Sequence, residues 1–164
     1  MTQALVIIDV QNDYFPGGAF PLWNPEAALA NTEKAMGQAR AQGVPVILVQ
    51  HLADGPSPFF NEGTPGARIH PRILAAAPGA PVIVKRHADA FHGTTLDRTL
   101  RDLGATGLKL AGMMTHNCVT HTALSRAAEP YAVTVLGDCC ATVSEILHRV
   151  ALNALSVRVE VPTA

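Results

Sequence analysis

Short apolar runs recur along the chain and alternate with segments of mixed polarity. The first run, residues 4–10, is almost continuously apolar, which is typical of a strand buried on both faces of a parallel sheet. Similar runs predict further strands at residues 45–50, 81–84, 108–113, 132–136 and 156–161. Segments with helical spacing connect most of these runs, so the pattern predicts right-handed crossovers and a three-layer α/β fold.

Helix start and stop signals support this alternation. Asn24 and Pro25 before the first mixed segment, and Gly43 after it, predict a helix over residues 25–42. Further helices are predicted at residues 96–103, 119–128 and 142–155. Residues 51–70 form a long loop rich in glycine and proline, and loops of that length inside a domain are usually functional.

Length and composition narrow the class of protein. The 164 residues fit a single domain over residues 1–164. Hydrophobic residues make up 48% of the chain and charged residues only 15%, which indicates an extensive core or a large subunit interface. We therefore expect a homo-oligomer, either a dimer or a tetramer.

Charge and cysteine content exclude several kinds of partner. The net charge is −1 and no basic cluster occurs, which argues against binding to nucleic acid or to an anionic membrane. No apolar run approaches the roughly 18 residues of a membrane span, and the amino terminus lacks the pattern of a signal peptide. Three cysteines, two of them adjacent, do not make a disulfide framework, so we expect reduced thiols and a cytoplasmic protein.

Candidate chemistry lies where the predicted strands end. Asp9, Lys85 and Cys118 stand at or near the carboxyl ends of the first, third and fourth strands, and ligands in parallel sheets bind at those ends. Cys118 also precedes a predicted helix. A helix amino terminus lowers the pKa of a thiol and offers backbone donors to an oxyanion. The three side chains are therefore expected to share one crevice as a nucleophile, a base and a cation.

These residues lie within motifs of a known family. The chain resembles the isochorismatase-like cysteine hydrolases, a group that includes nicotinamidases, N-carbamoylsarcosine amidases and streptothricin-type hydrolases. The resemblance covers essentially the whole chain and rests on residues 7–13 with Phe15, residues 63–67 with 69–71, Lys85 with residues 90–91 and 95–96, and residues 112–119.

The resemblance implies a fold and a mechanism. The fold would be a six-stranded parallel sheet with strand order 3-2-1-4-5-6. Cys118 would attack a carbonyl carbon, Asp9 would act as base and then as acid, and Lys85 would hold both groups in place. By the same resemblance the Met113–Met114 peptide bond would be cis, and the backbone N–H groups of Met114 and Cys118 would form an oxyanion hole. The expected substrate is a small amide, lactam or ureido compound.

Loop residues supply the candidates for substrate binding. Phe15 and Phe91 are aromatic and close in sequence to Asp9 and Lys85, and His51 and His92 stand near the same strand ends. These four residues are predicted to contact the substrate.

A metal site is a weaker possibility. By the resemblance, nicotinamidases bind a metal through an Asp-x-His pair after the second strand, but Val49 stands two residues before His51 here. His51 and His70 are therefore weak candidate ligands, because imidazoles without a carboxylate make a poor site. We expect neither a metal nor another cofactor. Two alternatives stay open: a metal-dependent nicotinamidase, and a non-catalytic binding or redox protein that uses Cys118 as an oxidisable thiol.

Overall fold

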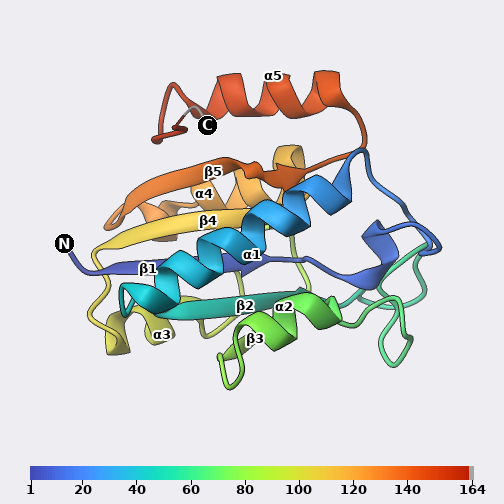
Figure 1. Cartoon of the computed structure of the whole chain (residues 1–164), viewed down its shortest axis with the longest axis horizontal. Coiled ribbons are helices and arrows are strands. Elements are labelled where there is room, and N and C mark those ends of the chain that lie inside the picture. Colours follow the sequence, from blue (N-terminus) through green and yellow to red (C-terminus); the bar gives the residue numbers. More distant parts are fainter. Residues whose placement is uncertain (163–164) are drawn as a thin grey trace.

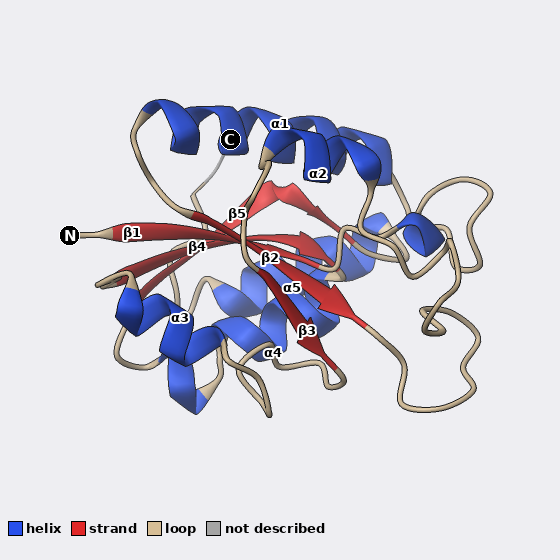
Figure 2. Cartoon of the chain, turned by 90° about the horizontal axis from the view of Figure 1, so that it is seen from below, coloured by secondary structure: helices blue, strands red, loops and turns tan. Residues whose placement is uncertain are grey.

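A parallel sheet between two layers of helices forms the core of the computed structural model, which describes residues 1–162 (Figures 1 and 2). The strand order is β3-β2-β1-β4-β5. The strands are β1 (Gln3–Ile8), β2 (Val46–His51), β3 (Val82–Lys85), β4 (Gly107–Met113) and β5 (Ala132–Ala141). The α-helices are α1 (Pro25–Ala41), α2 (Pro71–Ala76), α3 (Leu96–Asp102), α4 (Thr120–Ala123) and α5 (Glu145–Leu155).

Alternation along β1 explains the three layers. Leu5 and Ile7 pack in one buried cluster with residues of α1 and α2, whereas Val6 and Ile8 pack in the other cluster with residues of α3 and α4. Figure 2 shows α1 and α2 on one side of the sheet and α3, α4 and α5 on the other. The near-continuous apolar run of the sequence is therefore that of a central strand covered on both faces.

The predicted sixth strand is wrong. Residues 156–161 form a turn after α5 and make one isolated parallel bridge to the sheet, between Thr134 and Glu160. The N–H groups of Arg158 and Val159 both donate to the carbonyl of Leu155 at 2.9 Å. Because these two groups close the end of α5, they are not available for a sheet ladder. The sheet therefore has five strands.

The predicted helix over residues 119–128 is broken into short pieces. A π-helical turn at Thr115–Val119 leads into α4, and a separate 3-10 turn follows at Arg126–Ala128. The side chain of Ser125 accepts a hydrogen bond from the N–H of Ala127 at 3.2 Å and so starts the second turn. Cys118 lies inside the π-helical turn and not at the first position of a long helix.

A glycine allows β4 to approach β1 closely at the end where the chemistry is expected. Gly112 has φ +121°, and a Cβ atom at this position would lie 1.9 Å from the carbonyl oxygen of Ile8. Only glycine accepts this conformation and this contact. The close approach brings the turn that carries Cys118 next to the end of β1.

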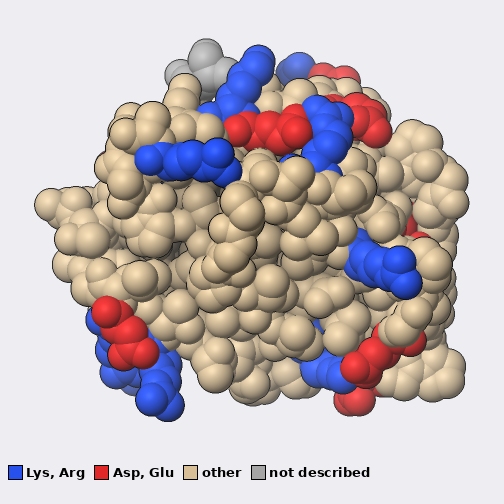
Figure 3. All heavy atoms as spheres, turned by 60° about the horizontal axis from the view of Figure 1, so that its bottom comes forward, with Lys and Arg blue, Asp and Glu red and all other residues tan. Residues whose placement is uncertain are grey.

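The surface carries charges of mixed sign. On the face in Figure 3, acidic and basic side chains lie beside one another in small groups around a broad uncharged centre. Within residues 1–162, none of the helices combines the length and apolarity needed to cross a bilayer. Ile146, Val150 and Val157 are 77%, 60% and 79% exposed at the α5 end of the molecule. This apolar exposure is compatible with the homo-oligomer expected from the composition, which stays a prediction.

We predict that Gly112→Ala lowers the free energy of unfolding by roughly 3 kcal/mol, because a side chain there is strained and meets the backbone of β1. Urea denaturation measures the change. Gly37→Ala is the matched control, because Gly37 lies within α1 and a methyl group added there would have no neighbouring atom within 4 Å. Alanine there should raise stability by roughly 0.5–1 kcal/mol. Equal stability of the two variants would contradict the close-approach argument.

Candidate active site

Three residues distant in sequence meet at the carboxyl edge of the sheet. Lys85 is the last residue of β3, Asp9 follows β1, and Cys118 lies in the turn after β4. The Lys85 Nζ atom is 2.8 Å from Asp9 Oδ2 and 3.2 Å from Cys118 Sγ. All three residues are at most 1% exposed. The structure therefore brings a carboxylate, an ammonium and a thiol into direct contact.

Asp9 is held in an unusual backbone conformation. Its φ is +52°, in the left-handed region that is uncommon for residues other than glycine. The N–H of Asp9 donates to Val49 O at 3.1 Å, and its carbonyl accepts from the N–H of Gln11 at 2.9 Å. Strain of this kind often occurs at functional sites. The ion pair with Lys85 at 2.8 Å compensates the buried charge of Asp9.

The ammonium of Lys85 is surrounded by four polar atoms. Besides Asp9 and Cys118, it lies 2.9 Å from His51 Nδ1 and donates to the carbonyl of His87 at 2.9 Å. Burial lowers the pKa of Lys85, but the negative charge of Asp9 acts in the opposite direction, and this pKa lies above its ordinary value. Lys85 therefore stays charged in the buried site.

The thiol of Cys118 behaves differently from the sequence-based expectation. Burial raises its pKa to about 12, and the charge of Asp9 acts in the same direction. The charge of Lys85 lowers this pKa but does not compensate for both effects. The lowered thiol pKa expected from the sequence is therefore wrong, because burial and the carboxylate of Asp9 outweigh the favourable contributions. The resting sulfur is a protonated thiol.

A glutamine clamp positions His51 beside the ammonium. Gln11 Nε2 donates to His51 O at 2.8 Å, and His51 N–H donates to Gln11 Oε1 at 2.8 Å. An ammonium can only donate hydrogen bonds, so Nδ1 of His51 accepts from Lys85.

A cavity of about 310 Å³ opens above Cys118. Its walls include the aromatic cluster of Tyr14, Phe59 and Phe60, in which the Tyr14 ring centroid lies 4.6 Å from that of Phe60 and 5.7 Å from that of Phe59. The other lining residues are His51, Ala53, Asp54, Pro56, Ser57, Met114, Asn117 and Cys118. The long loop predicted to be functional therefore supplies most of the walls.

Of the four residues predicted to bind substrate, His51 lines this cavity and the other three do not. The ring of Phe15 packs on His70 with 4.5 Å between centroids. Phe91 stacks on Tyr131, and His92 is exposed against His87. Tyr14, one residue before Phe15, lines the cavity where Phe15 was expected. The 3-10 turn Asn12–Tyr14 determines which of the two neighbouring rings points into the cavity, and the sequence gives no direct signal for this choice.

Asp13 is a second residue that the sequence pattern did not single out. Its Oδ2 accepts from Phe60 N–H at 2.8 Å, and its Oδ1 accepts from Ala19 N–H at 3.1 Å. Gly66 packs so closely that a Cβ there would lie 2.0 Å from Oδ1. This buried carboxylate therefore ties the cavity loop to the segment that follows β1.

Comparison with known proteins agrees with this geometry. The model of the Isochorismatase domain family matches residues 3–164. The chain belongs to the isochorismatase family. Isochorismatase-family members are hydrolases, and homologues of this chain include a nicotinamidase and amidohydrolases.

Three relatives illustrate the breadth of this isochorismatase family. The chain is 40% identical to the uncharacterized isochorismatase family protein YddQ of Bacillus subtilis, over 87% of this chain and 79% of YddQ. It is 31% identical to the ureidoacrylate amidohydrolase RutB of Methylobacterium radiotolerans, over 92% of this chain and 72% of RutB. A crystal structure assigned to the isochorismatase hydrolases, from Oleispira antarctica, superposes with a TM-score of 0.89 at 37% identity and covers 99% of this chain and 93% of the other.

The arrangement does not fit a bound metal ion. Within residues 1–162, Asp9, His51 and Cys118 are the one group of three potential ligands whose atoms lie within 4.8 Å of one another. The Lys85 ammonium lies between 2.8 and 3.2 Å from a ligand atom of each, so a cation already fills the space between them. His70, the other weak candidate, instead accepts from Arg72 N–H at 3.3 Å at the start of α2.

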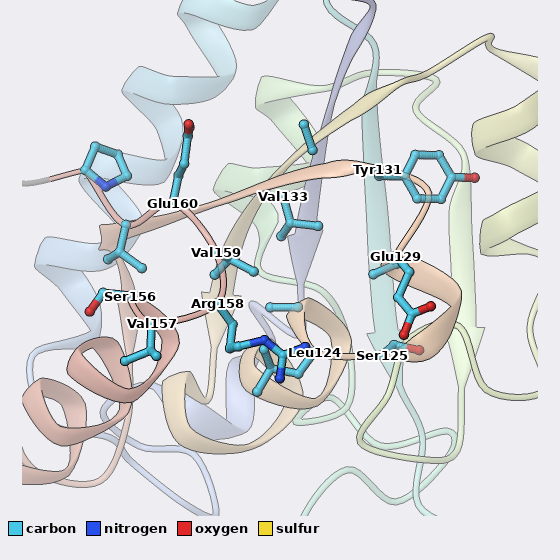
Figure 4. A pocket seen from close by; sticks show the side chains of 15 residues that line it. Leu124, Ser125, Glu129, Tyr131, Val133, Ser156, Val157, Arg158, Val159 and Glu160 are labelled. Atoms are coloured by element: carbon cyan, nitrogen blue, oxygen red, sulfur yellow. The ribbon is translucent and has the colours of Figure 1, made fainter.

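A larger hollow of about 840 Å³ lies elsewhere, between the α4 region and residues 156–162 (Figure 4). Leu124, Val133 and Val159 are among its lining residues, and its ionic side chains are Glu129, Arg158 and Glu160. It contains no thiol and none of the three residues that meet at Lys85. Size alone therefore does not identify the reactive site, and the chemistry lies in the smaller cavity.

We predict that Asp9→Asn lowers the pKa of Cys118 from about 12, because the carboxylate charge that opposes the thiolate is removed while Lys85 stays. The pH dependence of thiol alkylation, followed by mass spectrometry, measures this pKa. Asp138→Asn is the matched control, since the charge of Asp138 acts on Cys139 and Cys140 and not on Cys118. An unchanged Cys118 pKa in Asp9→Asn would show that the two groups are not coupled.

Proposed function

We propose that the protein is a cysteine-dependent hydrolase that cleaves the C–N bond of a small amide, lactam or ureido substrate. The observation that carries the proposal is the simultaneous contact of Lys85 with Asp9 and with Cys118, the sulfur residue that lines the cavity. Membership of a hydrolase family that includes amidohydrolases supports it.

The first half of the reaction forms an acyl-enzyme. Asp9 accepts the thiol proton as the Cys118 sulfur attacks the substrate carbonyl, so the thiolate exists only while it reacts. Lys85 stabilises the negative charge that moves from carboxylate to sulfur. The backbone N–H groups of Met114 and Cys118 stabilise the resulting oxyanion. When the tetrahedral intermediate collapses, the C–N bond breaks, Asp9 returns its proton to the leaving nitrogen, and a thioester remains.

The second half releases the acid. Asp9, again a carboxylate, takes a proton from a water molecule that attacks the thioester carbonyl. The C–S bond breaks, the sulfur regains a proton from Asp9, and the carboxylic or carbamic acid leaves. The neutral resting thiol fits this cycle, because each proton removed from sulfur or water has a carboxylate to receive it.

The main test is Cys118→Ala. Turnover of an amide, lactam or urea that the wild type hydrolyses should fall by roughly 10⁴-fold or more, because no nucleophile remains. Release of ammonia or amine, or for a lactam the ring-opened amino acid, measures turnover, and mass spectrometry of the wild type detects the thioester. Cys140→Ala is the control, since its sulfur donates to Leu136 O at 3.3 Å and does not line the cavity. Undiminished turnover in Cys118→Ala would refute the proposal.

The metal-dependent nicotinamidase alternative makes the opposite prediction about chelators. We expect turnover to be unchanged after treatment with a chelator and not to rise with added zinc, because the Lys85 ammonium occupies the space between the three potential ligands. Turnover assays with matched metal analysis of the protein measure this. Loss of turnover that zinc restores would favour the metal-dependent enzyme.

The redox-protein alternative has less support from the site. Oxidants react with thiolates, and sensor cysteines combine a low pKa with exposure. Cys118 has a raised pKa and is 1% exposed.

A further inference from the structure

The Tyr14 hydroxyl is a polar group of the cavity to which the mechanism assigns no role. Tyr14 is 1% exposed and lines the cavity together with Cys118. Its ring packs against Phe20, Phe59 and Phe60 at centroid distances of 6.4, 5.7 and 4.6 Å. Contacts on several sides of the ring hold the side chain in one orientation.

The hydroxyl makes no hydrogen bond to any side chain or backbone group within residues 1–162, although a buried tyrosine usually finds a partner. It is also not among the unpaired polar atoms sealed from solvent, and the residue lines the cavity. The second tyrosine of the chain differs in this respect, because the Tyr131 hydroxyl donates to Asp97 Oδ1 at 2.8 Å. The Tyr14 hydroxyl is therefore left available for a ligand.

Burial and the nearby carboxylates keep this hydroxyl a neutral donor. Burial raises the pKa of Tyr14, and the charges of Asp9 and Asp13 raise it further. Tyr14 and Cys118 line the same cavity. A ligand in that cavity can therefore meet both the hydroxyl and the sulfur.

The cavity has no free cation for a negatively charged ligand. Its lining includes no lysine or arginine, and Asp54 is its one carboxylate. Lys85 is already paired with Asp9, and Arg86 on the adjacent segment is bound to Ala53 O and Glu62 at 2.7 and 2.9 Å. A carboxylate entering this space would lose water without gaining an opposite charge, which is costly.

We propose that the Tyr14 hydroxyl donates a hydrogen bond to the carbonyl-bearing group of the substrate, and that the cavity selects uncharged amides or ureas over carboxylated ones. This inference rests on the proposed function, and it narrows the substrate class. Carboxylated ureas, the class to which ureidoacrylate belongs, are disfavoured.

Alkylation of Cys118 tests the selectivity without knowledge of the natural substrate. Iodoacetamide is a small uncharged amide, and iodoacetate is its carboxylate counterpart. Both react with the sulfur in the same way: a C–S bond forms, iodide leaves, and the thiol proton passes to Asp9 or to buffer. Rates are measured by intact-protein mass spectrometry and divided by the rates of each reagent with 2-mercaptoethanol.

In the wild type, the normalised rate with iodoacetamide should exceed that with iodoacetate by roughly tenfold or more. Tyr14→Phe keeps the ring and removes only the hydroxyl. It should slow iodoacetamide by roughly threefold to tenfold, as expected for the loss of one hydrogen bond, and leave iodoacetate unchanged. Tyr131→Phe is the matched control and should alter neither rate. Cys118→Ala corrects for any reaction at Cys139 and Cys140.

Two outcomes would overturn the inference. Equal normalised rates of the two reagents in the wild type would show that the cavity does not select by charge. An equal slowing of both reagents in Tyr14→Phe, or a large loss of thermal stability with it, would show that the residue acts on the thiol or the fold and not on the ligand. Alkylation of Cys118 requires no turnover. The alkylation rates therefore test the role of Tyr14 even if the hydrolysis assay refutes the proposed function.

Discussion

A charged ammonium and a carboxylate buried side by side are the constraint on which the rest of the structure depends. Isolated in the core, either Asp9 or Lys85 would be strongly unfavourable, and together they are tolerated only with close contact and additional polar partners. The fold supplies these conditions with His51 Nδ1 and His87 O around the ammonium. The left-handed turn at Asp9 and the close approach of β4 to β1 at Gly112 place the remaining partners within reach.

The raised thiol pKa follows from burial together with this pair. Burial and the charge of Asp9 both favour the thiol and outweigh the charge of Lys85, so the net effect of the surroundings is to keep the proton on sulfur. A protonated nucleophile beside an ionised base is protected from adventitious oxidation until a substrate carbonyl is in place. Reactivity then depends on proton transfer within the site and not on a permanently activated thiolate.

The sequence predicted the architecture and the convergence of Asp9, Lys85 and Cys118 because both follow from strand order. Apolar runs identify parallel strands, and residues that end such strands meet at one edge whatever their separation along the chain. Local geometry was not predictable in this way. The alternating valines of residues 156–161 resemble a strand, but Arg158 and Val159 use their N–H groups to close α5. Similarly, the choice between Tyr14 and Phe15 depends on the direction of one short turn.

The walls of the cavity and its reactive floor come from different parts of the chain. Residues 53–60 supply much of the wall, and the buried Asp13 anchors that loop through the N–H of Phe60. The floor belongs to strand ends fixed by the core. Insertions or exchanges between β2 and Phe60 can therefore give descendants a new specificity while the inherited reaction is preserved. Divergence within such a lineage can act on this loop independently of the strand ends.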